Sequence, residues 1–86
     1  MARRYGEPIV VRTAGGRPTA FTWRGVDYRV RVIGTWRLAT RWWEVETGAA
    51  VDRIYFRVQT ADQQVFELYC ELAGQGDRWV LDVCLD

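Results

Sequence analysis

The chain has 86 residues, which suits a single domain over residues 1–86 and leaves no room for a second. Hydrophobic residues make up 49% of it, so it can bury a core. All 12 basic residues are arginines, and with 11 acidic residues the net charge is +1. Lysine, histidine, serine and asparagine are absent, which excludes a serine nucleophile, a histidine base and a Schiff-base lysine. We therefore expect a protein that is not an enzyme and holds no cofactor.

The N-terminal segment gives no sign of export. Residues 1–6 contain two arginines, but no apolar run follows them, so they do not form a secretory signal. No apolar stretch approaches the roughly 20 residues of a membrane span, and two cysteines are too few for a disulfide-based scaffold. We expect a cytoplasmic protein that does not associate with membranes. Arginine without lysine also suits a GC-rich bacterial coding bias.

Strand patterns dominate the first third of the chain. Apolar and polar residues alternate over Val26–Val32, as in a strand with one buried face. A shorter strand, Phe21–Trp23, precedes it across Arg24–Gly25, which has the form of a two-residue hairpin turn. A further strand over Pro8–Thr13 is set off by a glycine-rich loop at residues 14–18.

The last third predicts three more strands, over Ile54–Thr60, Val65–Leu72 and Trp79–Leu85. No repeat or long amphipathic helix is visible. The sequence therefore predicts a mainly β fold, with about six short antiparallel strands forming a small barrel or a strongly bent sheet.

Apolar matching predicts the register of the last two strands. It places Cys70 opposite Leu81 on the core face, and Cys84 opposite Glu67 on the other face. Cysteines on opposite faces of a sheet cannot form a disulfide, and two thiols without histidine make at most half a zinc site. We therefore expect no disulfide and no metal, with Cys70 as a small core residue.

The second face of these strands mixes charges and aromatic residues. The expected pairing brings Arg57 beside Tyr69, and we expect Arg57 to form an exposed ion pair with an acid there. Glu71 and Asp82 could in principle act as an acid–base pair, but a domain of this length has little room for a substrate cleft. We interpret this face as a solvated surface.

The middle of the chain, Gly34–Arg53, follows neither a strand nor a helix period. Three tryptophans, Trp36, Trp42 and Trp43, lie there, outside clear strands. Two interpretations stay open for them. They form a lid over the core or an exposed platform for stacking.

The charges are divided unequally along the chain. Residues 1–41 hold nine arginines and two acids, a net of +7, whereas residues 42–86 hold three arginines and nine acids, a net of −6. Such asymmetry is found in basic docking surfaces. It would equally arise if the arginine-rich strands neutralise the acidic ones where they meet in the fold.

Several short motifs carry a resemblance to a known family. They are Arg3–Pro8, Gly16–Pro18, Phe21–Gly25, Tyr28, Trp36, Arg41–Trp43, Tyr55–Val58, Asp62, Phe66–Tyr69, Arg78–Leu81 and Asp86. With these motifs the chain resembles a small domain-of-unknown-function family of GC-rich bacteria. From about Trp36 to Asp86 it is also similar to the C-terminal tail of Y-family-polymerase-like proteins of the bacterial mutasome, although Asp62-Gln63 replaces the expected Asp-Gly. The resemblance implies an accessory or docking role in DNA repair and translesion synthesis, and no catalytic residues.

Together these observations predict a non-enzymatic interaction module that docks on a protein partner. The expected partner-binding residues are Trp36, Arg37, Arg41, Trp42 and Trp43, because interfaces favour tryptophan and arginine as anchors. The alternative is a small β-barrel that binds single-stranded nucleic acid with the same residues. Formation of a homodimer through an uncapped last strand is a further expectation.

Overall fold

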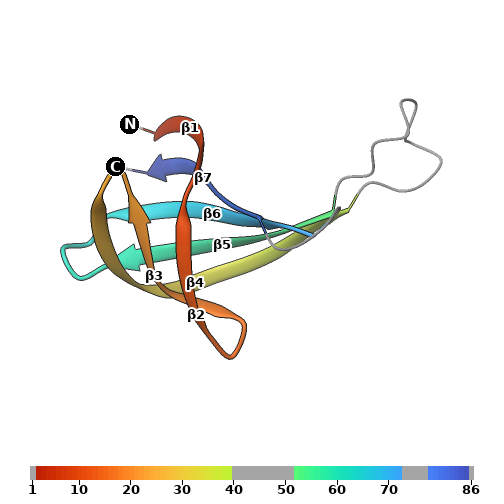
Figure 1. The fold of residues 1–86 in the computed structure, drawn as a ribbon, viewed down its shortest axis with the longest axis horizontal. Helices are drawn as coiled ribbons and strands as arrows, with labels where there is room; N and C mark the ends of the chain where they lie inside the picture. Colours follow the sequence, from red (N-terminus) through yellow and green to blue (C-terminus); the bar gives the residue numbers. More distant parts are fainter. Residues whose placement is uncertain (1, 40–51, 73–77, 86) are drawn as a thin grey trace.

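The computed structural model describes residues 2–39, 52–72 and 78–85, and almost all of these belong to β-strands (Figure 1). The seven strands are β1 (Ala2–Pro8), β2 (Val10–Ala14), β3 (Arg17–Trp23), β4 (Val26–Ala39), β5 (Asp52–Thr60), β6 (Val65–Glu71) and β7 (Arg78–Leu85). Within these ranges no helix is long and apolar enough to cross a membrane. The predicted mainly β fold is confirmed, with one strand more at the N-terminus.

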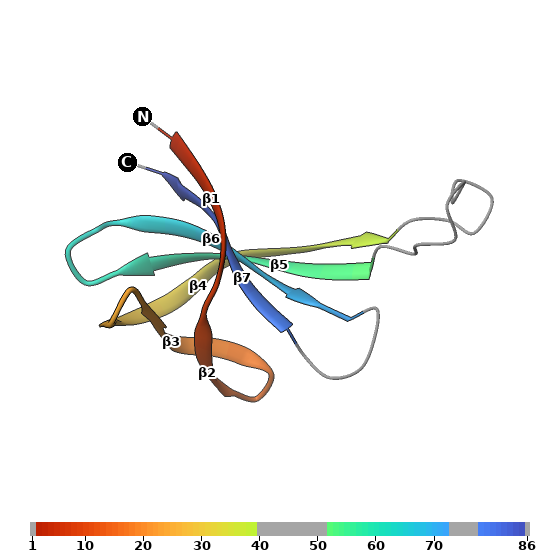
Figure 2. The ribbon, with the colours of Figure 1, turned by 45° about the horizontal axis from the view of Figure 1, so that its top comes forward.

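The strands form one antiparallel sheet in the order β1-β7-β6-β5-β4-β3-β2. Only Ile9 separates β1 from β2, so the two ends of this order belong to one continuous segment, which crosses the other strands in Figure 2. The Ile9 amide donates a hydrogen bond to the carbonyl of Trp79, 3.2 Å away. The sheet therefore curls strongly into a half-barrel. Because β7 lies between β6 and β1, the last strand is not the uncapped edge that the sequence predicted.

The concave face of the sheet carries the core. Its central cluster consists of Phe21, Phe56, Val58, Phe66, Leu68, Leu81 and Cys84. Phe21 on β3 stacks on Tyr28 of β4, with ring centroids 4.9 Å apart, and meets the edge of Phe66 on β6 at 5.3 Å. These rings join the two halves of the curled sheet across its interior. The opposite, convex face is called the outer face below.

The first hairpins follow the sequence closely. Trp23 lies opposite Val26, and the two turn residues Arg24 and Gly25 have positive φ angles of 52° and 76°. Positive φ at both central positions is the mark of the type I′ turn, which matches the twist of a hairpin. The predicted hairpin is therefore confirmed. The glycine-rich loop is shorter than expected, since β3 already begins at Arg17.

Strand β4 is twice as long as the sequence predicted. It pairs with β3 over Val26–Arg29 and with β5 from Val30 to Ala39, and the register shifts at a bulge around Ile33. A bulge adds one residue and reverses the alternation of the side chains. That reversal hid the second half of β4 in the sequence, so the prediction of an irregular segment over Gly34–Arg53 is wrong up to Ala39 and again at Asp52 and Arg53, while its remainder lies outside the described residues.

The predicted register of the last hairpin is also wrong. Cys70 lies opposite Trp79, two residues from its expected partner, and Cys84 lies opposite Phe66. The register shifts between Leu81 and Val83, where Asp82 is the extra residue. This bulge turns Cys84 into the core, where its exposed fraction is 8%, instead of onto the outer face. Apolar residues occupy both alternations of β7, so the sequence pattern alone does not distinguish the two registers. The burial of Cys70 is confirmed.

Candidate interaction surface

Three aromatic side chains form a row across the outer face of the sheet. Trp36 on β4 lies opposite Tyr55 on β5, which lies opposite Tyr69 on β6. The rings of Trp36 and Tyr55 are stacked, with centroids 5.4 Å apart and planes 2° from parallel. The centroids of Tyr55 and Tyr69 are 5.2 Å apart. These three residues are called the aromatic row.

An ion pair flanks the row along one side. Arg57 lies opposite Glu67 on the outer face, and a guanidinium nitrogen is 2.8 Å from the carboxylate. The same guanidinium is over the ring of Trp36, with Cζ 5.6 Å from its centroid. Gly34 is the β4 residue opposite Arg57 and has no side chain to compete for that space. The expected ion pair of Arg57 with an acid is confirmed, but the expected position of Arg57 beside Tyr69 is wrong.

A second ion pair flanks the row along the other side. Arg53 donates a 2.7 Å hydrogen bond from Nε to Glu71, and its Cζ lies 4.5 Å from the ring centroid of Tyr69. The hydrogen bond to Glu71, and then one to Tyr55, raise the pKa of Arg53 above its ordinary value. Each side of the aromatic row therefore carries a guanidinium that contacts a ring and a carboxylate at once.

The structure does not bring the predicted partner-binding residues together on one surface. Trp36 belongs to the aromatic row and keeps 40% of its surface exposed. Arg37 follows it in the strand and lies opposite Ile54, on the other face of the sheet. There it forms an ion pair with Asp52 at 2.7 Å, which lowers the pKa of that carboxyl. The remaining three residues lie outside the described ranges: Arg41, Trp42 and Trp43.

Sequence reasoning missed the residues that complete this surface. Tyr55, Tyr69, Arg53 and Arg57 alternate with core residues, and the pattern placed three of them on the outer face without joining them to Trp36. The signal was present, because a tyrosine occurs at an outward position in each of two adjacent strands. It was lost because the expected β5–β6 register paired these strands two residues away from the observed one.

The two acids that the sequence analysis considered as an acid–base pair, Glu71 and Asp82, occupy separate structural positions. Glu71 is held by Arg53, and Asp82 occupies the bulge of β7. The parts of the chain that are described contain no group of three side chains able to hold a metal ion.

A comparison with protein-family models finds one family that covers the chain. The model of a domain of unknown function, DUF6504, matches residues 1–86. The chain belongs to the DUF6504 family. No curated protein and no solved structure matches it. The expected membership of a family of unknown function is thus confirmed for this DUF6504 protein, while its similarity to mutasome proteins stays a prediction.

Proposed function

We propose that this DUF6504 protein is a non-enzymatic interaction module, and that the aromatic row is its docking surface for a protein partner. The observation that carries the proposal is the set of three rings, Trp36, Tyr55 and Tyr69, aligned across three strands on the outer face. The few residues that carry most of the binding energy in protein interfaces are enriched in tryptophan, tyrosine and arginine. Rings that are already stacked lose little conformational entropy when a partner covers them.

The ion pairs favour a protein over nucleic acid at this surface. The arginines on the two sides of the row, Arg57 and Arg53, are each within 3 Å of a glutamate. A phosphate backbone placed there would meet those carboxylates, and their repulsion would offset its attraction to the guanidiniums. A protein partner gains from the same arrangement, because neutral ion pairs around a ring cluster form a polar rim around an apolar centre.

The cellular role that we propose rests on the sequence resemblance. The sequence predicts a similarity to mutasome polymerase-like proteins, based on spaced aromatic residues that include Trp36 and the Tyr55–Val58 segment. We therefore propose a cytoplasmic accessory of DNA repair and translesion synthesis, whose partner is a protein of that machinery.

Affinity capture with matched variants tests the docking surface. The wild-type protein, the double variant Trp36→Ala/Tyr69→Ala and the control Val10→Ala are immobilised and exposed to an extract of the source cells. Val10 is an exposed apolar residue of β2, on a strand outside the row. We expect at least one protein to be retained by the wild type and the control, and lost by the double variant.

The proposal fails if all three baits retain the same proteins or if none retains any. Circular dichroism of each bait shows whether the sheet is kept. If the double variant loses its β signal, the single variant Tyr69→Phe takes its place. It keeps the ring and removes only the hydroxyl, so a lost partner then reports on the surface and not on folding.

A further inference from the structure

A second surface of the sheet gathers arginines that have no ion pair in the described part of the chain. Arg12 on β2, Ala20 on β3 and Arg29 on β4 lie opposite one another in a single row. Arg31 follows two positions after Arg29 on the same side of β4, opposite Gln59, to which it donates a 3.0 Å hydrogen bond. All three arginines are exposed, and together they are called the arginine surface.

No ion pair of the described residues involves an arginine of this surface. Four ion pairs occur within the described ranges, and only Arg37–Asp52 joins the basic half of the sequence to the acidic half. Two carboxylates occur nearby in the chain, and each accepts a hydrogen bond from a threonine: Asp27 from Thr22 and Asp62 from Thr60. The three arginines therefore form no ion pair within the described ranges, and Asp27, two positions before Arg29 on the same side of β4, is the acid nearest to Arg29 along the chain.

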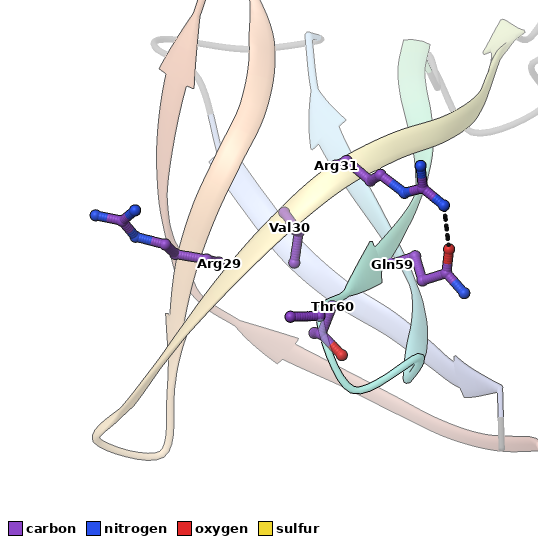
Figure 3. A pocket seen from close by; sticks show the side chains of 6 residues that line it. Arg29, Val30, Arg31, Gln59 and Thr60 are labelled. Atoms are coloured by element: carbon purple, nitrogen blue, oxygen red, sulfur yellow. Dashed lines mark hydrogen bonds between the residues drawn. The ribbon is translucent and has the colours of Figure 1, made fainter.

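The arginine surface is laid out to meet more than one anionic group. Residues two apart on a strand are about 7 Å apart, and residues two strands apart are separated by about 10 Å. Figure 3 shows Arg29 extended away from β5, whereas Arg31 extends toward Gln59. Guanidiniums that diverge in this way do not converge on a single phosphate. They suit a polyanion that lies across the strands.

A pocket opens between the two arginines of β4. It has a volume of about 240 Å³ and is lined by Arg29, Val30, Arg31, Gln59, Thr60 and Ala61 (Figure 3). It forms where β4 changes its partner from β3 to β5, since Arg29 is the last residue paired with β3 and Val30 the first paired with β5. The side chain of Gln59 adds a hydrogen-bonding group beside the guanidiniums.

We propose that the arginine surface binds the phosphate backbone of nucleic acid, without regard to its sequence. Guanidinium groups match phosphate oxygens in shape and charge, and backbone contacts supply most non-specific affinity. No aromatic side chain belongs to this surface, so stacking on bases does not contribute. This inference goes beyond the proposed docking function, because it uses a different surface and a different class of partner.

Fluorescence anisotropy with labelled oligonucleotides tests the proposal. Single-stranded and duplex DNA of about 20 nucleotides are titrated with protein at two salt concentrations. Three backbone contacts predict a slope of log affinity against log salt between about −2 and −3. The triple variant Arg12→Gln/Arg29→Gln/Arg31→Gln is expected to weaken binding by at least about 10-fold at low salt and to flatten this slope.

The matched control removes the same charge elsewhere. Arg3→Gln/Arg4→Gln/Arg78→Gln replaces three exposed arginines of β1 and β7, and we expect it to change the affinity by less than about 3-fold. Equal losses in the two triple variants, or no binding by the wild type at low salt, would overturn the proposal. Equally tight binding to polyglutamate or to anionic vesicles would also overturn it, because the surface would then accept any polyanion.

Two further measurements keep the result interpretable. If the triple variant loses its circular dichroism signal, the single variant Arg29→Gln replaces it, and a salt slope reduced by about 1 is the expected result. An unchanged slope in that variant would count against the proposal. The variant Trp36→Ala/Tyr69→Ala is expected to keep its affinity for DNA, so failure of the docking function and failure of this inference can be told apart.

Discussion

Trp36 on β4 stacks on Tyr55 of β5 with ring planes 2° from parallel and centroids 5.4 Å apart. The two residues are direct cross-strand partners, and the guanidinium of Arg57 lies on the ring of Trp36. A partly exposed aromatic pair of this kind stabilises the hairpin, and in the proposed function it also presents a flat surface to a partner. The two roles can be separated by measurement.

Replacing Trp36 by alanine should lower the free energy of unfolding by about 1–2 kcal/mol, because the ring stack and the cation–π contact are both lost. Urea denaturation followed by circular dichroism measures the change. The control is Leu38→Ala, since Leu38 is an exposed residue two positions further along β4. We expect a loss below about 0.5 kcal/mol for that control. Equal losses in the two variants would show that the stack contributes nothing.

The ion pair of Arg53 with Glu71 should be coupled more strongly than that of Arg24 with Glu7. The side chains of the first pair are 31% and 21% exposed, against 60% and 35% for the second. A double-mutant cycle with Arg53→Gln and Glu71→Gln should give a coupling energy of about 0.5–1 kcal/mol. The same cycle at Arg24 and Glu7 should give less, because water screens that pair more fully. A larger coupling at the exposed pair would contradict this ranking.

The strands and the tightest turn could be predicted because their signals are local. The alternation over Val26–Val32 and the turn at Arg24–Gly25 specify a hairpin without reference to the rest of the chain. The sequence predicted a strongly bent or closed sheet, but not which strands form its two ends. Those ends are joined through Ile9, and no local sequence pattern indicates that contact.

The bulges could not be predicted, and most errors follow from them. Around Ile33 and at Asp82 one extra residue reverses the side-chain alternation, and its position depends on how the sheet bends against its neighbours. For the candidate site, the sequence grouped Trp36 with Arg37, whereas the structure places these two residues on opposite faces of the sheet. Neighbours in a strand point to opposite faces, and the sequence did not show that Trp36 lies in a strand.

The stability of the protein should fall in acid partly through Glu7. Hydrogen bonds from Arg24, and then from Trp23, lower the pKa of Glu7 below its ordinary value. A lowered pKa in the folded state contributes stability above the ordinary glutamate pKa of about 4.3, and this contribution disappears as the pH falls through the folded value. The free energy of unfolding should therefore decrease between about pH 5 and pH 2.

The variant Glu7→Gln isolates this contribution. It has no carboxyl to titrate, so its stability should depend less on pH over the same range, and its difference from the wild type should shrink in acid. Urea midpoints at several pH values measure both effects. Parallel pH profiles for the wild type and Glu7→Gln would mean that Glu7 does not carry the dependence.

Cys84 offers a direct test of the observed register. The bulge at Asp82 turns it into the core, with 8% of its surface exposed, whereas the register expected from the sequence would place it on the outer face. In the variant Cys70→Ala, alkylation of Cys84 should be at least about 100-fold slower in native buffer than in urea, because the sheet must open before the thiol is reached. The control is Leu38→Cys in the double variant Cys70→Ala/Cys84→Ala, whose exposed thiol should react at nearly the same rate in both conditions. Rapid native alkylation of Cys84 would mean that β7 pairs in the register without the bulge.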